Sequence, residues 1–330
     1  MVRNTIVPTS MAPKAILVTG VAGFIGSNFV AEFKKRFPKT EIVCIDDFST
    51  GRRDRVDKST KFYEGTVCDL KLLSRIFAKH RPEFVFHFAA VPRVAYSVQH
   101  PTETTVSNIL GTVSLLEKSK EYGVKRFIYS SSSSIYGGAK KLPTKEKDNP
   151  PNPVSPYGLQ KYTGEPFCKI FSDLFGLDTV SLRYFNVFGP WQYGDSAYST
   201  VICAWLERLY IPSSKRPYLE DDGKQSRDFC YVGNVVDANI LAMLSKKPLR
   251  GAAVNIAHGE RTTLLEVKQL IEKFTKKKLD LERRKPRLGD VRHTHADISA
   301  ARKLFGYQPK VDFETGLRKT IQWFQSRTEN

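Results

Sequence analysis

Three glycines spaced three residues apart stand directly after the first apolar run of this chain. The run covers Ala15–Thr19, the glycines are Gly20, Gly23 and Gly26, and an amphipathic pattern follows over Phe24–Arg36. Glycine lets the backbone at such a turn approach a pyrophosphate, and the free amides at the start of the helix attract its charge. The arrangement predicts a strand, a dinucleotide-binding turn and a helix, with a simple packing turn as the alternative.

A second apolar run with a terminal acid supports the nucleotide interpretation. The run covers Glu41–Ile45, and Asp46 follows it twenty residues after Gly26. A carboxylate at this place accepts hydrogen bonds from the adenosine ribose and repels a 2′-phosphate, so it predicts NAD rather than NADP. The neighbouring Asp47 adds negative charge. Three arginines that follow could instead bind a 2′-phosphate: Arg52, Arg53 and Arg55.

Short β-branched runs alternate with amphipathic patterns through the first half of the chain. This rhythm predicts an α/β fold with a doubly wound, parallel Rossmann sheet. The predicted strands are 15–19, 41–45, 84–87, 126–130 and 179–183, and the predicted helices are 24–36, 70–80, 102–122 and 156–175. After Asn186 the pattern becomes irregular and indicates a smaller second domain, with helices predicted at 235–245, 264–274, 298–305 and 313–324.

Composition limits the class of protein. The 330 residues carry 52 Lys plus Arg against 34 Asp plus Glu, so the net charge is +18, which favours anionic partners. The five cysteines show no paired metal-site spacing, which predicts a reducing compartment. No run of about 20 apolar residues occurs, so we expect a cytoplasmic protein without a membrane partner.

Two pairs of Tyr and Lys at a spacing of four residues are candidates for acid–base chemistry. Tyr157 and Lys161 begin a predicted helix, where this spacing brings both side chains onto one face. A tyrosine acting as a base near neutral pH needs its pKa lowered by roughly 3 units from about 10. The second pair, Tyr136 and Lys140, encloses two glycines that favour a turn, so Tyr157 is the better candidate. The serine run 130–134 could supply a hydroxyl or merely form a polar loop.

Taken together, the motifs resemble those of the extended short-chain dehydrogenase/reductases, and specifically of the UDP-hexose 4-epimerases. The matching segments are TGVAGFIGS, CIDDFSTG, CDL around Asp69, HFAA at 87–90, SSSSIYG, SPYGLQK, LRYFNVFGP, QSRDFCYV and RLGDVRHTHADISAARKLFGY. The resemblance implies an NAD-binding Rossmann domain over 1–185, with a returning segment near 225–250. It also implies a UDP-sugar-binding α/β domain over 186–330.

The resemblance further implies roles for individual residues. Tyr157 would be the catalytic base, Lys161 would bind the nicotinamide ribose and lower the pKa of the phenol, and Ser132 would supply the catalytic hydroxyl. The NAD cofactor would be held by Gly20, Gly23, Phe24, Ile25, Gly26, Asp46, Asp47, Ser49, Thr50, Gly51, Asp69, Leu70, Phe88, Ala89, Ala90, Asn108, Ser130, Tyr157, Lys161 and Tyr184. The UDP-sugar would be held by Ser132, Asn186, Arg227, Arg287, Asp290 and Thr294. No metal is implied.

The implied reaction is epimerisation at carbon 4 of a UDP-hexose through a transient 4-keto intermediate. Relatives that dehydrate or decarboxylate carry acids where this chain has Ser133 and Ser134, so epimerisation is favoured. The small Thr294 stands where relatives that carry tyrosine are confined to plain hexoses, which implies room for the acetamido group of UDP-N-acetylglucosamine and UDP-N-acetylgalactosamine. The alternative is that Trp191 or Tyr193 closes the pocket.

Other interpretations remain open from the residues alone. A UDP-glucuronate 4-epimerase shares the same motifs. A polyanion or RNA binder on a nucleotide-binding fold is a different class, suggested by nine Lys or Arg against four acids over 271–292. No RNA-binding aromatic signature accompanies these charges, so no nucleic-acid partner is expected. The resemblance implies a homodimer formed through two helices.

Overall fold

The computed structural model describes residues 12–193, 200–211, 217–284 and 291–327. The chain divides into two compact units, each assembled from separate stretches of sequence. The first contains the residues up to 132, then 155–183 and 236–254; the second contains 133–154, 184–235 and the residues from 255 on. The stretch 133–154, which a division at residue 185 assigns to the first domain, is therefore part of the second unit.

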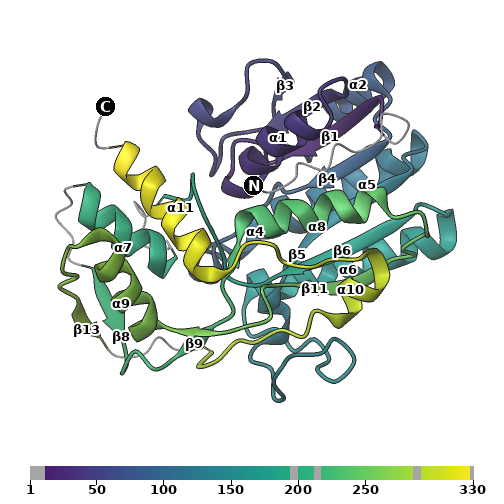
Figure 1. Ribbon diagram of the computed structural model, residues 1–330. Helices are drawn as coiled ribbons and strands as arrows, with labels where there is room; N and C mark the ends of the chain where they lie inside the picture. The colour runs from purple at the N-terminus through teal and green to yellow at the C-terminus, as the bar shows by residue number, and fades with distance from the viewer. Residues whose placement is uncertain (1–11, 194–199, 212–216, 285–290, 328–330) are drawn as a thin grey trace. The chain divides into compact units, whose positions relative to one another are not determined.

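A seven-stranded sheet forms the centre of the first unit (Figure 1). Its strands are β1 (Ala15–Thr19), β2 (Glu41–Asp46), β3 (Lys61–Glu64), β4 (Phe84–His87), β5 (Arg126–Ser132), β6 (Thr179–Tyr184) and β11 (Ala252–Ile256). Their order is β11-β6-β5-β4-β1-β2-β3, and β1 pairs in parallel with both β2 and β4. This arrangement confirms the predicted doubly wound sheet. The strand order reverses between β1 and β4, which is where such sheets bind ligands, beside the carboxyl ends of the strands.

Helices cover both faces of this sheet. They are α1 (Phe24–Arg36), α2 (Leu70–His80), α3 (Val94–Gln99), α4 (Pro101–Thr105), α5 (Gly111–Glu121), α6 (Pro156–Phe175) and α8 (Val232–Leu244). Successive strand residues point to opposite faces. Leu17 and Val85 therefore pack in a core with residues of α2, α5 and α6, while Phe86 packs against Phe29 of α1 at a ring-centroid distance of 4.3 Å.

The helix predicted over 102–122 is interrupted. A turn of π-helix, Val106–Leu110, separates α4 from α5. Asn108, within this turn, accepts a hydrogen bond from the amide of Val91 at 2.8 Å and donates one to Gln160 Oε1 at 2.7 Å. Hydrophobic periodicity reports only on neighbouring residues. It therefore predicts one continuous helix and does not reveal a turn that contacts with distant segments hold in place.

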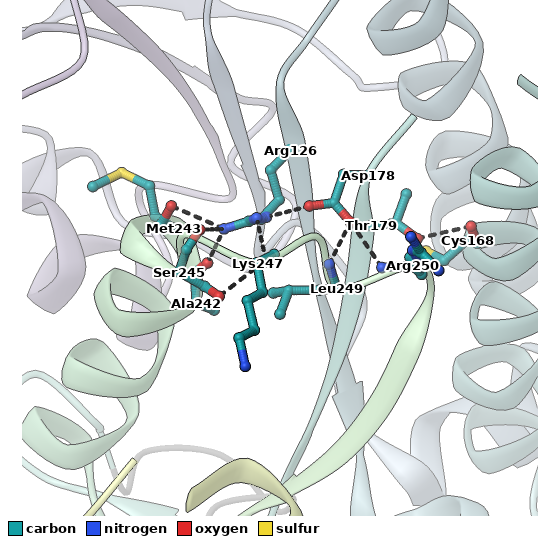
Figure 2. Close-up of polar contacts among 10 residues, drawn as sticks. All are labelled: Arg126, Cys168, Asp178, Thr179, Ala242, Met243, Ser245, Lys247, Leu249 and Arg250. Carbon is teal, nitrogen blue, oxygen red and sulfur yellow. Dashed lines mark hydrogen bonds and ion pairs between the residues drawn. The ribbon is translucent and has the colours of Figure 1, made fainter. Parts of the chain in front are cut away.

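A single arginine joins β5 to the end of α8 (Figure 2). The Arg126 guanidinium donates to four carbonyl oxygens at and beyond the end of that helix, those of Ala242, Met243, Ser245 and Lys247. Its Nε also donates to Asp178 at 2.7 Å, and the other carboxylate oxygen of Asp178 accepts the amides of Leu249 and Arg250. The cation thus satisfies carbonyls that a helix end leaves without partners, and it opposes the negative end of the helix dipole.

The second unit is built from short strands and helices. Its strands pair two by two: β7 (Val187–Phe188) with β10 (Cys230–Tyr231), β8 (Tyr218–Glu220) with β13 (Glu282–Arg284), and β9 (Ser226–Arg227) with β12 (Thr262–Thr263). Its helices are α7 (Val201–Tyr210), α9 (Leu264–Thr275), α10 (Ser299–Phe305) and α11 (Phe313–Ser326). Trp205, Ile271 and Phe324 lie in its core. In the described parts of both units, no helix has the length and apolar character that crossing a membrane requires.

Candidate functional site

The glycine turn is shaped for close backbone approach. Gly20 follows β1 with φ of +70°, and a Cβ there would lie 2.5 Å from the amide nitrogen of Ala89. A Cβ on Gly26 would lie 2.3 Å from the carbonyl oxygen of Gly20. Gly23 is the N-cap of α1, and the predicted residues Phe24 and Ile25 form its first turn. The turn therefore fits a pyrophosphate at the start of a helix.

Asp46 ends β2, as the sequence predicts, and its carboxylate organises the loop beside the glycine turn. Its two oxygens accept the amides of Ala22 at 2.9 Å and Phe48 at 2.8 Å. Burial raises the pKa of Asp46, while these two hydrogen bonds oppose the rise. Further along the loop, Asp47 accepts the amide of Ser49 at 2.9 Å, and Thr50 follows. Each carboxylate oxygen of Asp46 keeps a second lone pair for ribose hydroxyls.

The three arginines after this acid have protein partners. Arg53 forms a two-pronged contact with Glu64 at 2.7 and 2.5 Å, and its guanidinium lies 4.1 Å from the Phe48 ring centroid. Arg52 lies 3.5 Å from Asp54, and Arg55 donates to the carbonyl of Ala22 at 3.3 Å. Glu64 ends β3 directly opposite Asp46 in the strand register. The carboxylates of Asp46 and Glu64 thus stand at paired strand ends, and Arg53 is engaged by Glu64, which favours an unphosphorylated ribose.

The strand ends beside the glycine turn are joined by a hydrogen-bonded chain. Thr19 Oγ1 lies 2.8 Å from His87 Nδ1 and accepts the amide of Ala89 at 3.1 Å. On its other side, His87 Nε2 lies 2.9 Å from Thr112 Oγ1, which donates to the carbonyl of Asn108 at 2.7 Å. Because Thr112 donates its proton to that carbonyl, His87 is the Nε2–H donor and Nδ1 accepts from Thr19. Burial lowers the pKa of His87, consistent with a neutral ring.

Other predicted cofactor residues occupy the same end of the sheet or the loops beyond it. Phe88 follows β4, and its amide donates to the carbonyl of Thr19 at 3.2 Å; Ala90 lies two residues later. Gly51 sits against Ala22, where a Cβ would lie 2.6 Å from that side chain. Asp69 caps α2 by accepting the amides of Lys71 and Leu72, and Leu70 is the first residue of that helix. Tyr184 is the last residue of β6.

The candidate base lies buried in the first turn of α6. Burial raises the pKa of Tyr157 to about 12, and a hydrogen bond with the Ser132 side chain opposes that rise. Lys161 lies one turn later on the same helix face and donates to the carbonyl of Ser130 at 2.8 Å. Burial lowers the pKa of Lys161 to about 7. The predicted trio therefore meets where β5 ends and α6 begins.

The second Tyr–Lys pair is arranged differently. Tyr136 is buried and donates its hydroxyl proton to Asn255 Oδ1 at 2.7 Å. Gly137 and Gly138 follow it with φ of +58° and +99°. A turn of this kind separates Tyr136 from Lys140, as the two glycines predict.

Predicted substrate residues of the second unit meet at one threonine. Thr294 Oγ1 accepts hydrogen bonds from Asn186 Nδ2 at 2.9 Å and from the amide of Asp228 at 3.0 Å. Arg227 donates to the carbonyls of Ser226 and Arg292. With both hydroxyl lone pairs engaged, Thr294 keeps one proton to donate. Two further predicted residues, Arg287 and Asp290, lie outside the described residues.

Asp228 is an anchoring residue that sequence reasoning left unassigned. Its carboxylate accepts the amides of His258 at 3.0 Å, Gly259 at 3.2 Å and Ala296 at 3.0 Å. Burial raises its pKa to about 7, and these amides oppose the rise. The only sequence signal was its place in the segment QSRDFCYV.

The second unit also contains an open pocket of about 450 Å³. Its lining is mostly small or aliphatic and includes Gly138, Ala139, Leu142 and Val291, together with Arg292 and His293. Arg292 is paired with two acids, Asp221 at 2.7 Å and Asp222 at 2.9 Å. The pocket is therefore suited to a small group that is only partly polar.

Comparison with known proteins identifies similar chains. A sequence model of the NAD dependent epimerase/dehydratase family matches residues 16–257. A putative UDP-glucose 4-epimerase from Methanocaldococcus jannaschii is 33% identical over 312 residues, 94% of this chain and 98% of that protein. The structure of UDP-glucose 4-epimerase with UDP-glucose from Thermotoga maritima is 37% identical, with a TM-score of 0.89, and covers 95% of this chain and 99% of that one. The structure of a UDP-N-acetylglucosamine 4-epimerase from Methanobrevibacter ruminantium, in complex with UDP-N-acetylmuramic acid, is 34% identical, with a TM-score of 0.87. The match covers 96% of this chain and 99% of that one.

Proposed function

This chain belongs to the NAD-dependent epimerase/dehydratase family, and we propose that it epimerises carbon 4 of UDP-hexoses, taking the N-acetylhexosamine pair as well as UDP-glucose and UDP-galactose. The hydrogen bond between Ser132 and Tyr157, with Lys161 on the same face of α6, carries the proposal. The glycine turn and Asp46 fit the pyrophosphate and adenosine ribose of NAD. When bound, NAD would take a hydride from carbon 4 of the sugar and return it.

In this proposal the chain's own residues move the hydroxyl proton. Tyr157 would accept the proton of the 4-hydroxyl and later return it, and Ser132 would hold the phenol and the sugar hydroxyl in line. Burial leaves Tyr157 protonated at neutral pH, so positive charge is needed to draw its proton away. Lys161 lies one turn away, anchored through the carbonyl of Ser130, and it would supply that charge in its protonated form, which burial limits by lowering its pKa to about 7.

The second unit supports the proposed range of sugars. Thr294 is small and is held in place by Asn186 and Asp228. The open pocket lined by Gly138, Ala139 and neighbouring residues includes His293, which directly precedes Thr294. Asn186, Arg227 and Thr294 would contact the UDP-sugar in this proposal.

Direct kinetics test this function. Purified enzyme would be incubated with UDP-glucose, UDP-N-acetylglucosamine and UDP-glucuronate, and the products separated by chromatography. We expect epimers of the first two substrates at comparable kcat/KM, and little product from the third. Turnover of UDP-glucose alone would contradict the proposal that the enzyme accepts N-acetylhexosamines. Turnover of UDP-glucuronate alone would show that the substrate is a UDP-hexuronate.

We also propose a homodimer formed through α6 and the helical segment that runs beside it. Exposed aliphatic side chains follow one another along α6, and two more lie on the neighbouring π-turn: Leu159, Ile170 and Leu174, and Val106 and Leu110. A monomer rarely leaves such a row uncovered, and a second copy of the same helix pair would bury it. Light scattering at micromolar concentration is expected to give about twice the chain mass, whereas Leu174→Glu with Leu110→Glu would give one chain mass.

We place the protein in the cytoplasm as part of the same proposal. All five cysteines are free thiols, and four of them are buried. Free thiols persist in reducing compartments. Cell fractionation would test the location, and recovery with a secreted fraction would contradict it.

A further inference from the structure

The end of β5 is attached to α6 at three successive residues. The carbonyl of Ser130 accepts from Lys161, Ser131 Oγ donates to Glu165 Oε1 at 2.5 Å, and the Ser132 side chain bonds Tyr157. On the helix, these partners are spaced four residues apart and therefore share one face. Two of the three attachments involve the proposed acid–base groups, and the middle one does not.

The middle attachment is a buried ion pair with good geometry. Glu165 accepts Arg183 Nε at 2.9 Å and Nη2 at 2.7 Å, and both side chains are almost fully buried. Charges removed from water are costly unless hydrogen bonds satisfy them. The two-pronged arginine and the Ser131 hydroxyl supply such bonds, which fixes the orientation of the carboxylate. Glu165 thereby joins α6 to β5 and to β6.

Resting on the proposed function, we propose that Ser131, Glu165 and Arg183 are positioning residues that hold the end of β5 in register with α6. The Ser131 hydroxyl ties the strand at the residue directly before Ser132. Without that tie, the last residue of β5 is free to shift relative to the first turn of α6. The contact between Ser132 and Tyr157 then lengthens, although neither Glu165 nor Arg183 touches the substrate.

The variant Ser131→Ala tests this role without leaving a buried charge unpaired. We expect kcat on UDP-glucose to fall roughly tenfold with KM little changed, because small misplacements of reacting groups are expensive. The acid limb of the kcat–pH profile is expected to move to higher pH, because the phenol loses a hydrogen bond that favours its ionised form. A purely structural role would lower the melting temperature without moving that limb.

A matched control lies on the same helix. Asp173 forms an exposed ion pair with Lys169, and Asp173→Asn is expected to leave kcat and the pH profile unchanged. The double variant Glu165→Gln with Arg183→Gln removes the buried pair together and is expected to reproduce the effect of Ser131→Ala. Unchanged kcat and pH profile in both Ser131→Ala and the double variant would overturn the proposal.

Crystal structures separate this inference from the proposed function. The distance between Ser132 Oγ and Tyr157 Oη can be measured in the unmodified protein and in Ser131→Ala whatever substrate the enzyme takes. We expect it to exceed 3.5 Å, a usual hydrogen-bond limit, only in the variant. An unchanged distance would refute the positioning role, whereas an unmodified protein that epimerises no UDP-hexose would refute only the proposed function.

Discussion

The two units hold their candidate residues in different ways. In the first unit, the proposed base and hydroxyl stand at the end of a long strand and the start of a 20-residue helix, with partners on both elements. In the second unit, Asn186 and Thr294 lie outside the named strands and helices, and Asp228 fixes the backbone around them. Regular elements fix geometry more tightly than loops do. In the proposed function, the first unit therefore holds the groups that move the proton, and the second holds the residues that would contact the sugar.

The largest expected effect is the loss of the base. Tyr157→Phe keeps the ring and removes the proton acceptor, so kcat should fall by at least about a hundredfold while NAD remains bound. The matched control is Tyr136→Phe, which loses the hydrogen bond to Asn255 and should cost about 1 kcal/mol of stability. Steady-state kinetics and cofactor content check both. Inactivity of Tyr136→Phe alongside full activity of Tyr157→Phe would show that the wrong pair was chosen.

The next effect is a loss of stability. Asp228→Asn turns an amide nitrogen toward backbone amides that need an acceptor, so the free energy of unfolding should fall by about 2 kcal/mol. Chemical denaturation measures it. As a control, Asp222→Asn removes one half-exposed partner of Arg292, which keeps Asp221, and it should change stability by less than about 1 kcal/mol. A stable Asp228→Asn variant would mean that the second unit does not depend on this carboxylate.

Asp228 also makes a pH-dependent contribution. Its folded pKa is raised from 3.8 to about 7, so the folded state binds this proton more tightly than the unfolded state. The contribution is therefore fully present below pH 3.8 and is lost as the pH rises to about 7. Denaturation curves between pH 4 and 7 should show the unmodified protein losing relative stability against Asp228→Asn as pH increases. An identical pH dependence in both proteins would contradict the buried, protonated carboxyl.

A smaller effect concerns the sugar. Thr294→Tyr adds bulk and removes the acceptor used by Asn186, so kcat/KM on the acetylated pair should fall about tenfold, while plain hexoses stay largely usable. Thr294→Ser, which keeps the hydroxyl, should retain both activities. Kinetics on the two sugar pairs decide. An equal loss on both pairs would place this residue outside sugar selection.

The smallest effect concerns the cofactor. Asp46→Ala should narrow the preference for NAD over NADP by roughly fivefold, since the net contribution of a typical hydrogen bond is about 1 kcal/mol. Fluorescence titration with both reduced nucleotides measures it. Arg53→Ala should change the preference little, because Arg53 is paired with Glu64. Equal affinity of the unmodified protein for the two nucleotides would mean that the arginines outweigh the acid.

How much the sequence predicts also differs between the units. In the first, apolar runs and glycines place β1, α1, α2, β4 and α6 at their observed bounds, since local patterns suffice for buried strands and amphipathic helices. The edge strands β3 and β11 were missed, because an edge strand needs no continuous apolar run. The helix α7 was missed as well, within a stretch that its prolines and glycines made look irregular.

Site residues were predictable where a motif carries them and unpredictable where distance in sequence hides the partner. The trio of Ser132, Tyr157 and Lys161 was named from motifs, and the structure brings the three together. The backbone amides that donate to the Asp228 carboxylate lie 30 to 68 residues further along the chain. No local pattern announces such a contact.

The hydrogen bonds of Arg126 with the end of α8 affect the order in which the chain can fold during synthesis. A ribosome delivers this arginine 116 to 121 residues before the carbonyl oxygens of 242–247 that receive it. Every shorter nascent chain therefore carries a cation whose final burial site has not been synthesised. Asp178 can pair with this cation earlier, but the guanidinium reaches its full set of hydrogen bonds only after translation has passed residue 247. Completion of the first unit is thus a late event in synthesis, and it follows the synthesis of residues 133–154 and 184–235, about half of the second unit.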